Sequence, residues 1–187
     1  DDKSLIGFIG GPWTLFTYAI EGAHKGHLKT AKTSFDLYTK FCEILIPLLE
    51  QNIKMQLDAG AEVVMILDTA AGEISALDYN LFVAPTVRAL AKKFPGKTGY
   101  YAKGVAYEHY NSLGTCEFAG LGFDHRWSLD KLPQDLKKGF FQGNFDQTLL
   151  FTPENQFKKI LLEYLAPLKD LSDEQRAGWV CGLGHGI

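Results

Sequence analysis

Residues 7–22 read GFIGGPWTLFTYAIEG and join a short apolar run to an aromatic-rich segment through Gly10-Gly11-Pro12. A short apolar run that ends in glycine and proline is typical of a buried strand followed by a turn. The aromatic segment after the turn contains Tyr18. An aromatic side chain among other aromatics usually packs in a core, so this stretch alone favours packing over ligand contact for Tyr18.

The same alternation of short apolar runs with longer amphipathic segments continues along the chain. The short apolar runs predict six strands, at residues 5–9, 62–67, 98–102, 117–122, 140–143 and 179–183. Four of the segments between them are expected to be helical, at residues 34–59, 78–94, 133–138 and 156–168.

Prolines and a threonine predict where these helices break or begin. Pro47 is expected to kink the helix at residues 34–59 or split it in two, and Pro85 interrupts residues 78–94. Thr152 is a candidate cap for residues 156–168, with Pro153 in the first turn.

Alternating strands and helices with nearly continuous apolar strands predict an α/β fold with a parallel sheet covered by helices. An open nucleotide-binding sheet is disfavoured, because no GxGxxG or GxxxxGK[ST] loop follows the first strand. A complete (β/α)8 TIM barrel takes about 250 residues. The 187 residues, which neither begin with methionine nor end like a natural terminus, are therefore expected to be one domain, residues 1–187, of an incomplete barrel without its N-terminal strands and C-terminal helix.

Composition excludes several functional classes. The 19 basic and 22 acidic side chains nearly balance, which gives no general electrostatic basis for nucleic-acid or membrane-surface binding. The 3 cysteines form no CxxC pair or metal-type cluster, which favours a cytoplasmic location without disulfides. The apolar runs are too short to span a membrane, and the first residues show no signal-peptide pattern.

Polar side chains follow most of the predicted strands. Side chains just beyond the carboxyl ends of parallel strands converge on one face, where binding sites are built. Those positions hold Tyr18, Asp68, Thr69, Lys103, Asp124, His125, Asn144, Asp146 and His185. Asp68 and Asp124 could instead cap the next helix or satisfy loop amides. Glycines on both sides of His185 allow close approach of backbone or ligand, so His185 is a better candidate for a site residue than for a core histidine, with a tight turn as the alternative reason for the glycines.

Six motifs in order carry a resemblance to a known family. GFIGGPWTLFTYAIEG resembles the GF-G-PWTL-TY--EG signature of uroporphyrinogen decarboxylase, and LDTAAG, YYAKG, GLGFD, QGNFD and LGHGI follow at compatible spacing. The resemblance covers essentially the whole chain. It identifies the expected six strands with the third to eighth strands of that family's barrel.

The resemblance implies a cytoplasmic homodimeric carboxy-lyase that uses no metal or organic cofactor. Its small-molecule substrate is a tetrapyrrole: the family converts uroporphyrinogen III to coproporphyrinogen III in haem biosynthesis by removing its acetate carboxyl groups. Carried over by motif, Tyr18 matches the active-site tyrosine, Thr69 the substrate-contacting Ser/Thr of F-D-[ST], and His185 the histidine of LGHG. The family's RQAGR-type arginines and pyrrole-binding aspartate precede these motifs and are not in this sequence, so this fragment is expected to be inactive alone.

Several positions depart from the family pattern and leave alternatives open. The tryptophan that follows GLD in the family is displaced here by His125-Arg126, and Cys181 replaces an asparagine. Related cobamide-dependent methyltransferases use a zinc-bound thiolate near this point, but the segment YYAKG lacks their H-x-C ligands. A zinc-dependent methyltransferase relative is thus one alternative, and a non-catalytic tetrapyrrole-binding module is another.

Overall fold

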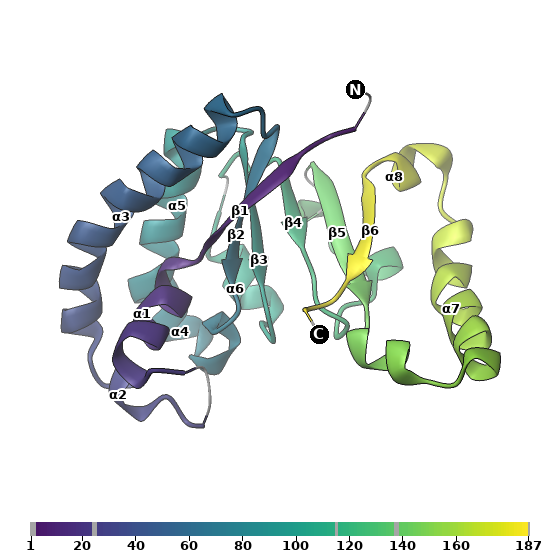
Figure 1. Cartoon of the computed structure of the whole chain (residues 1–187), viewed down its shortest axis with the longest axis horizontal. Helices are drawn as coiled ribbons and strands as arrows, with labels where there is room; N and C mark the ends of the chain where they lie inside the picture. Colours follow the sequence, from purple (N-terminus) through teal and green to yellow (C-terminus); the bar gives the residue numbers. More distant parts are fainter. Residues whose placement is uncertain (1–2, 24–25, 115, 137–138, 187) are drawn as a thin grey trace. The chain divides into compact units, whose positions relative to one another are not determined.

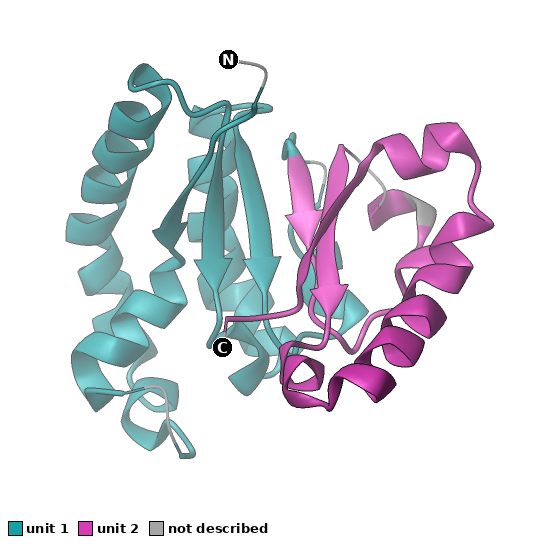
Figure 2. Cartoon of the chain, turned by 45° about the vertical axis from the view of Figure 1, so that its right-hand side comes forward, with its two compact units in different colours: residues 1–119 teal, residues 120–187 magenta. Residues whose placement is uncertain are grey.

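The computed structural model describes residues 3–23, 26–114, 116–136 and 139–186, and contacts divide the chain into two compact units, residues 1–119 and 120–187 (Figures 1 and 2). Each unit contains parallel strands followed by helices. The assignment of residues 1–187 to a single domain stays a prediction.

The first unit contains three parallel strands that pair in chain order, β1 with β2 and β2 with β3. Its strands and helices are β1 (Ile6–Gly10), α1 (Pro12–Glu21), α2 (Lys29–Lys32), α3 (Phe35–Asp58), β2 (Val63–Asp68), α4 (Ala76–Asp78), a π-helical turn (Tyr79–Val83), α5 (Ala84–Lys93), β3 (Thr98–Ala102) and α6 (Tyr107–Asn111). A short 3-10 turn, Ala71–Glu73, follows β2.

The core of the first unit lies between its strands and the helices α1, α3 and α5 (Figure 1). Trp13 and Phe16 of α1 are buried against Tyr38 of α3, with ring centroids 5.4 Å apart in both pairs. Burying large aromatic side chains contributes much of the stabilisation of a core. These contacts fix α1 beside the strands and show that Trp13 and Phe16 pack in the core.

The second unit contains β4 (Gly120–Gly122), β5 (Phe140–Phe145) and β6 (Trp179–Leu183), paired in parallel and in chain order. Between β5 and β6 lie α7 (Glu154–Lys169) and the short α8 (Asp173–Ala177) (Figure 2). The 3-10 turns of this unit are Leu129–Lys131, Gln134–Leu136 and Gln147–Phe151. The rings of Phe157 and Tyr164 in α7 pack edge-on against Phe145 at the end of β5.

The predicted strands agree with the structure to within a few residues. The strands expected at residues 98–102 and 179–183 match β3 and β6. The strand expected at residues 117–122 is shorter and begins at Gly120. The strand expected at residues 140–143 continues to Phe145.

Two helix predictions were wrong in detail. The helix expected to kink or split at Pro47 is not split: α3 is one continuous helix with Pro47 inside it. Pro47 and Glu43 lie on the exposed side of α3, where water can satisfy the carbonyl group that the missing N–H leaves without a partner. Thr152 does not cap α7: its hydroxyl donates to the carbonyl of Leu149, and Pro153 is the N-cap residue.

The remaining helix predictions are largely confirmed. The interruption expected near Pro85 is the π-helical turn Tyr79–Val83, after which the proline occupies the first turn of α5. The short helix expected at residues 133–138 is the 3-10 turn Gln134–Leu136, and residues 137–138 lie outside the described part of the chain.

The α/β fold class is confirmed, and the βα repeats are those of an incomplete (β/α)8 TIM barrel. Within the described residues, no helix is both long enough and apolar enough to cross a membrane.

The turn between β1 and α1 predicts a strong effect of adding one methyl group. A Cβ atom at Gly11 would lie 2.5 Å from both Cβ and Cγ of Asp68, and the φ angle of Gly11, −67°, is open to any residue. Gly11→Ala should therefore lower the free energy of unfolding through overpacking alone, by about 1–3 kcal/mol. Urea unfolding followed by circular dichroism measures this change.

The matched control is Gly182→Ala in β6, where an added Cβ would meet its nearest neighbour at 3.8 Å, an ordinary contact. Gly182→Ala should change the free energy of unfolding by no more than about 0.5 kcal/mol. Equal stability of Gly11→Ala and the wild type would show that α1 does not approach Asp68 this closely.

Candidate functional site

The turns that follow β1 and β2 are joined through Thr14 in the first turn of α1. The backbone N–H and the hydroxyl of Thr14 both donate to Oδ1 of Asp68, at 2.9 and 2.7 Å. The same hydroxyl accepts a hydrogen bond from the backbone N–H of Ala70 at 3.0 Å. The start of α1 has no side-chain cap of its own. Asp68, at the end of the neighbouring strand, therefore takes the place of a capping residue.

Asp68 is fully buried, and its second carboxylate oxygen is also hydrogen-bonded. The Tyr100 hydroxyl donates to Oδ2 at 3.3 Å, and the Tyr79 hydroxyl donates to that of Tyr100 at 2.8 Å. Burial raises the pKa of Asp68 from 3.8 to about 6, against the opposing effect of the hydrogen bonds from Thr14 and Tyr100. Burial likewise raises the pKa of both tyrosines well above 10.

These bonds position two of the predicted site residues. Thr69 is partly buried and lies between Asp68 and Ala70, each of which is hydrogen-bonded to Thr14. Tyr18 follows Thr14 by four positions in α1, so the two side chains lie on the same face of the helix, one turn apart. The Tyr18 side chain is 49% exposed, whereas Trp13 and Phe16 are buried. Thr14 thus joins the turn that contains Thr69 to the helix that carries Tyr18, and the Tyr18 ring is accessible to solvent.

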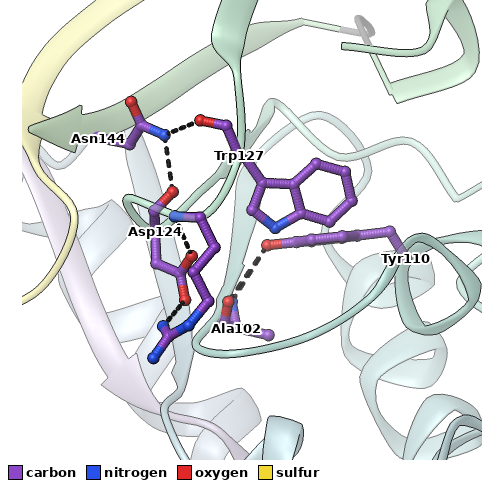
Figure 3. Close-up of polar contacts among 6 residues, drawn as sticks. Ala102, Tyr110, Asp124, Trp127 and Asn144 are labelled. Carbon is purple, nitrogen blue, oxygen red and sulfur yellow. Dashed lines mark hydrogen bonds and ion pairs between the residues drawn. The ribbon is translucent and has the colours of Figure 1, made fainter. Parts of the chain in front are cut away.

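In the second unit, Asn144 and Asp124 join the turns that follow β4 and β5. The side-chain amide of Asn144 donates to the backbone carbonyls of Asp124 and Trp127 at 2.7 and 2.6 Å (Figure 3). Asp124 is fully buried and accepts hydrogen bonds from both the backbone and the guanidinium group of Arg126. Asn144 therefore fixes both ends of the segment 124–127.

His185, the third predicted site residue, lies in the turn after β6 and is partly buried. The preceding Gly184 donates its N–H to the carbonyl of Phe145 at 2.7 Å. A Cβ atom at Gly184 would lie 2.7 Å from the backbone nitrogen of His125. Only glycine fits this approach, so the turns after β4, β5 and β6 lie against one another next to His185 in the chain.

A cavity of about 410 Å³ lies elsewhere in the second unit, between the end of β5 and α7. Its lining includes Trp127, Asn144 and Tyr164 together with the carboxylates of Asp130, Asp146 and Glu163. None of the three predicted site residues lines it. The cavity is therefore separate from Tyr18, Thr69 and His185, but its lining includes His125, Asn144 and Asp146, three of the strand-end positions that the sequence singles out.

The described residues include no group of three or more His, Cys, Asp and Glu side chains arranged to hold a metal ion. Cys181, the position that raised the zinc-dependent alternative, is an exposed free cysteine. Cys42 is buried, and burial raises the pKa of its thiol.

In each unit, polar side chains lie at the carboxyl ends of parallel strands, which is the site arrangement of (β/α)8-barrel proteins. The family model described as Uroporphyrinogen decarboxylase (URO-D) matches residues 1–187. The chain belongs to the uroporphyrinogen decarboxylase family.

Named relatives support this assignment. Uroporphyrinogen decarboxylases of Chlorobium phaeobacteroides and Chlorobium limicola are 32% and 33% identical over 98% of this chain. That of Corynebacterium diphtheriae is 28% identical over the whole chain. The chain spans about half the length of these relatives, 54% to 56%.

A solved structure with the same fold is a methyltransferase from Methanosarcina mazei. It aligns with a TM-score of 0.74 over 98% of this chain and 54% of its own, at 20% sequence identity. At this level of identity, the likeness shows the fold alone.

Sequence reasoning missed the residues that organise the turns. Thr14 lies inside PWTL, one residue after a buried tryptophan, and nothing in the local pattern marks it as the partner of a carboxylate 54 residues away. Asn144 was singled out only as a strand-end residue, and its bonds to the segment 124–127 depend on strand pairing. A position at a strand end predicts the turn in which a residue lies but not the contacts that its side chain makes.

The buried carboxylate predicts a pH dependence of stability. Because folding raises the pKa of Asp68 from 3.8 to about 6, its stabilising contribution is fully present below pH 4 and is lost as the pH rises through 6. The loss is roughly 3 kcal/mol by pH 7. In Asp68→Asn this dependence should be absent, so the difference in unfolding free energy between the two proteins should change with pH between 4 and 7.

Urea unfolding at several pH values measures that difference. Asp58→Asn, which removes an exposed carboxylate paired with Lys54 in the same unit, is the control and should follow the wild-type pH profile. If the unfolding free energies of the wild type and Asp68→Asn changed with pH in parallel, folding would not raise the pKa of Asp68.

Proposed function

We propose that this chain functions in the decarboxylation of the acetate side chains of uroporphyrinogen III to give coproporphyrinogen III, a step of tetrapyrrole and haem biosynthesis. The observation that carries the proposal is the match of the family model over residues 1–187. The linked turns after β1 and β2 support it, because Thr14 joins the turn that contains Thr69 to the helix that carries Tyr18.

The proposed reaction explains why the site can consist of hydrogen-bonding groups. Loss of carbon dioxide from an acetate leaves a carbanion, and protonation of the adjacent pyrrole carbon makes the substrate itself the electron sink. The protein then has to orient the ring, bind its carboxylates and balance the charge of the protonated pyrrole. Proton donors and fixed charges suffice for these tasks.

Tyr18, Thr69 and His185 are proposed to orient the substrate. The Tyr18 hydroxyl is a donor on a half-exposed ring, Thr69 supplies a hydroxyl held between two bonded neighbours, and His185 supplies an imidazole at the end of β6. Hydroxyl and imidazole groups can donate to a carboxylate oxygen. In this proposal Tyr18 also contacts the reacting pyrrole and is the catalytic residue of the set.

The chain is further proposed to form only part of the complete site. The arginines and the aspartate that the family uses to bind substrate carboxylates and pyrroles have no counterpart in these residues. We therefore expect binding without turnover for these 187 residues, and turnover by a cytoplasmic homodimer in the complete enzyme.

An assay of product formation tests this proposal. The 187-residue chain incubated with uroporphyrinogen III should form no coproporphyrinogen, whereas the complete enzyme containing these residues should form it, as separated by liquid chromatography. Product formed by the 187 residues alone would contradict the proposed division of the site. Absence of product from the complete enzyme would contradict the reaction itself and favour a tetrapyrrole-binding role.

Removal of single hydroxyl groups tests the proposed site residues. In the complete enzyme, Tyr18→Phe and Thr69→Val should each lower kcat/KM by about 10- to 100-fold, the loss of one hydrogen bond to a charged group. Steady-state kinetics measure the effect, and circular dichroism checks the fold.

Thr39→Val is the matched control, because the Thr39 hydroxyl donates only to the carbonyl of Phe35 on the exposed side of α3. It should leave kcat/KM unchanged. Wild-type kinetics in Tyr18→Phe would remove this hydroxyl from the mechanism.

A further inference from the structure

Arg126 lies at the carboxyl end of β4 and is held by a buried carboxylate. Its backbone N–H donates to Oδ1 of Asp124 at 2.9 Å, and Nη1 of its guanidinium group donates to Oδ2 at 2.7 Å. The Asp124 side chain is 1% exposed. Two hydrogen bonds from one residue to both oxygens of a buried carboxylate fix the direction of that residue's side chain.

The loop that carries Arg126 is fixed at both ends. The Asn144 side-chain amide donates to the carbonyls of Asp124 and Trp127, which flank Arg126 on either side. Asn144 is itself 4% exposed. The position of the guanidinium group is thus set before any ligand binds, which lowers the entropic cost of binding one.

Most of the Arg126 guanidinium group remains available. A guanidinium group has five N–H donors in a planar fork, and the Arg126 side chain is 53% exposed. Among the described residues, the only hydrogen-bond or ion-pair partner of this group is Asp124. An exposed guanidinium fork on a rigid support matches the geometry of a carboxylate.

Arg126 is also close to the turn that carries His185. Gly184 approaches the backbone of His125 so closely that a Cβ atom would lie 2.7 Å from its nitrogen. The pKa of Asp146 is lowered mainly by its hydrogen bonds from Thr148, and further by the positive charges of His125 and Arg126. Arg126 is therefore close enough to Asp146 to interact with it electrostatically. Arg126 therefore lies where three strand-end turns meet.

We propose that Arg126 binds a carboxylate of the tetrapyrrole substrate beside His185. The proposal rests on the proposed function and adds a residue that the family signature does not contain, because His125-Arg126 displaces the tryptophan that follows GLD. Uroporphyrinogen has acetate and propionate carboxylates around its ring, so one of them can meet a fixed guanidinium group from this unit.

Binding of stable porphyrins to the 187-residue chain tests the proposal. Quenching of tryptophan fluorescence gives the Kd of uroporphyrin III, the oxidised ring that keeps every acetate and propionate group. Arg126→Gln should raise this Kd by about 10- to 100-fold, the loss of a hydrogen bond to a charged group. Arg126→Lys keeps the charge but not the fork, and should raise it less.

Two further measurements separate ligand binding from structure. Arg176→Gln, which removes the exposed arginine that pairs with Asp173 in α8, should leave the Kd unchanged. Coproporphyrin III has methyl groups in place of the acetates. If Arg126→Gln loses affinity for uroporphyrin alone, the carboxylate that Arg126 binds belongs to an acetate group. If it loses affinity for both porphyrins, that carboxylate belongs to a propionate group.

The possible failures are distinguishable. If the wild-type chain binds uroporphyrin and folded Arg126→Gln binds it equally tightly, the role of Arg126 is overturned and the proposed function stands. If Arg126→Gln and Arg176→Gln weaken binding equally, the effect is one of net charge and the role of Arg126 is again overturned. If the wild-type chain binds neither porphyrin, the proposed function is contradicted together with the role of Arg126.

Discussion

A carboxylate without access to water needs hydrogen-bond donors, and Asp68 obtains them from Thr14 and Tyr100. This requirement brings the first turn of α1 against the end of β2. It leaves no room for a side chain at Gly11, and it places Thr69 between two residues that bond to Thr14. The positions proposed to contact substrate in the first unit therefore depend on one buried charge.

The second unit repeats this arrangement with different residues. Asp124 is also a buried carboxylate at a strand end, and Arg126 and the fixed loop around it satisfy its oxygens. Asn144 serves as the connecting side chain, as Thr14 does in the first unit. In both units, a buried polar residue rather than an apolar contact joins neighbouring turns. Buried polar groups form hydrogen bonds only in specific geometries, so they hold the turns, and the ligand-binding groups on them, in fixed positions.

The sequence predicted the fold class and the strand positions well, because strand periodicity and turn residues are local signals. Two predictions from local sequence were wrong because contacts and solvent exposure in the folded protein determine the structure at those positions. Pro47 remains inside a helix because its side of α3 faces water, and Thr152 bonds backward to Leu149 instead of capping α7. Strand ends also indicated where polar groups would gather. The bond between Thr14 and Asp68 joins residues 54 positions apart, so it depends on the register of β1 and β2 and could not be predicted from either segment.

We propose that the strand-end turns of this chain bind a tetrapyrrole. Hydrogen–deuterium exchange of the 187-residue chain, with and without uroporphyrin III, tests it most directly because it reports each segment separately. The account predicts slower exchange with ligand in residues 12–22, 69–72, 124–127 and 184–186. Unchanged exchange in these segments, or slower exchange confined to α7, would contradict this proposal.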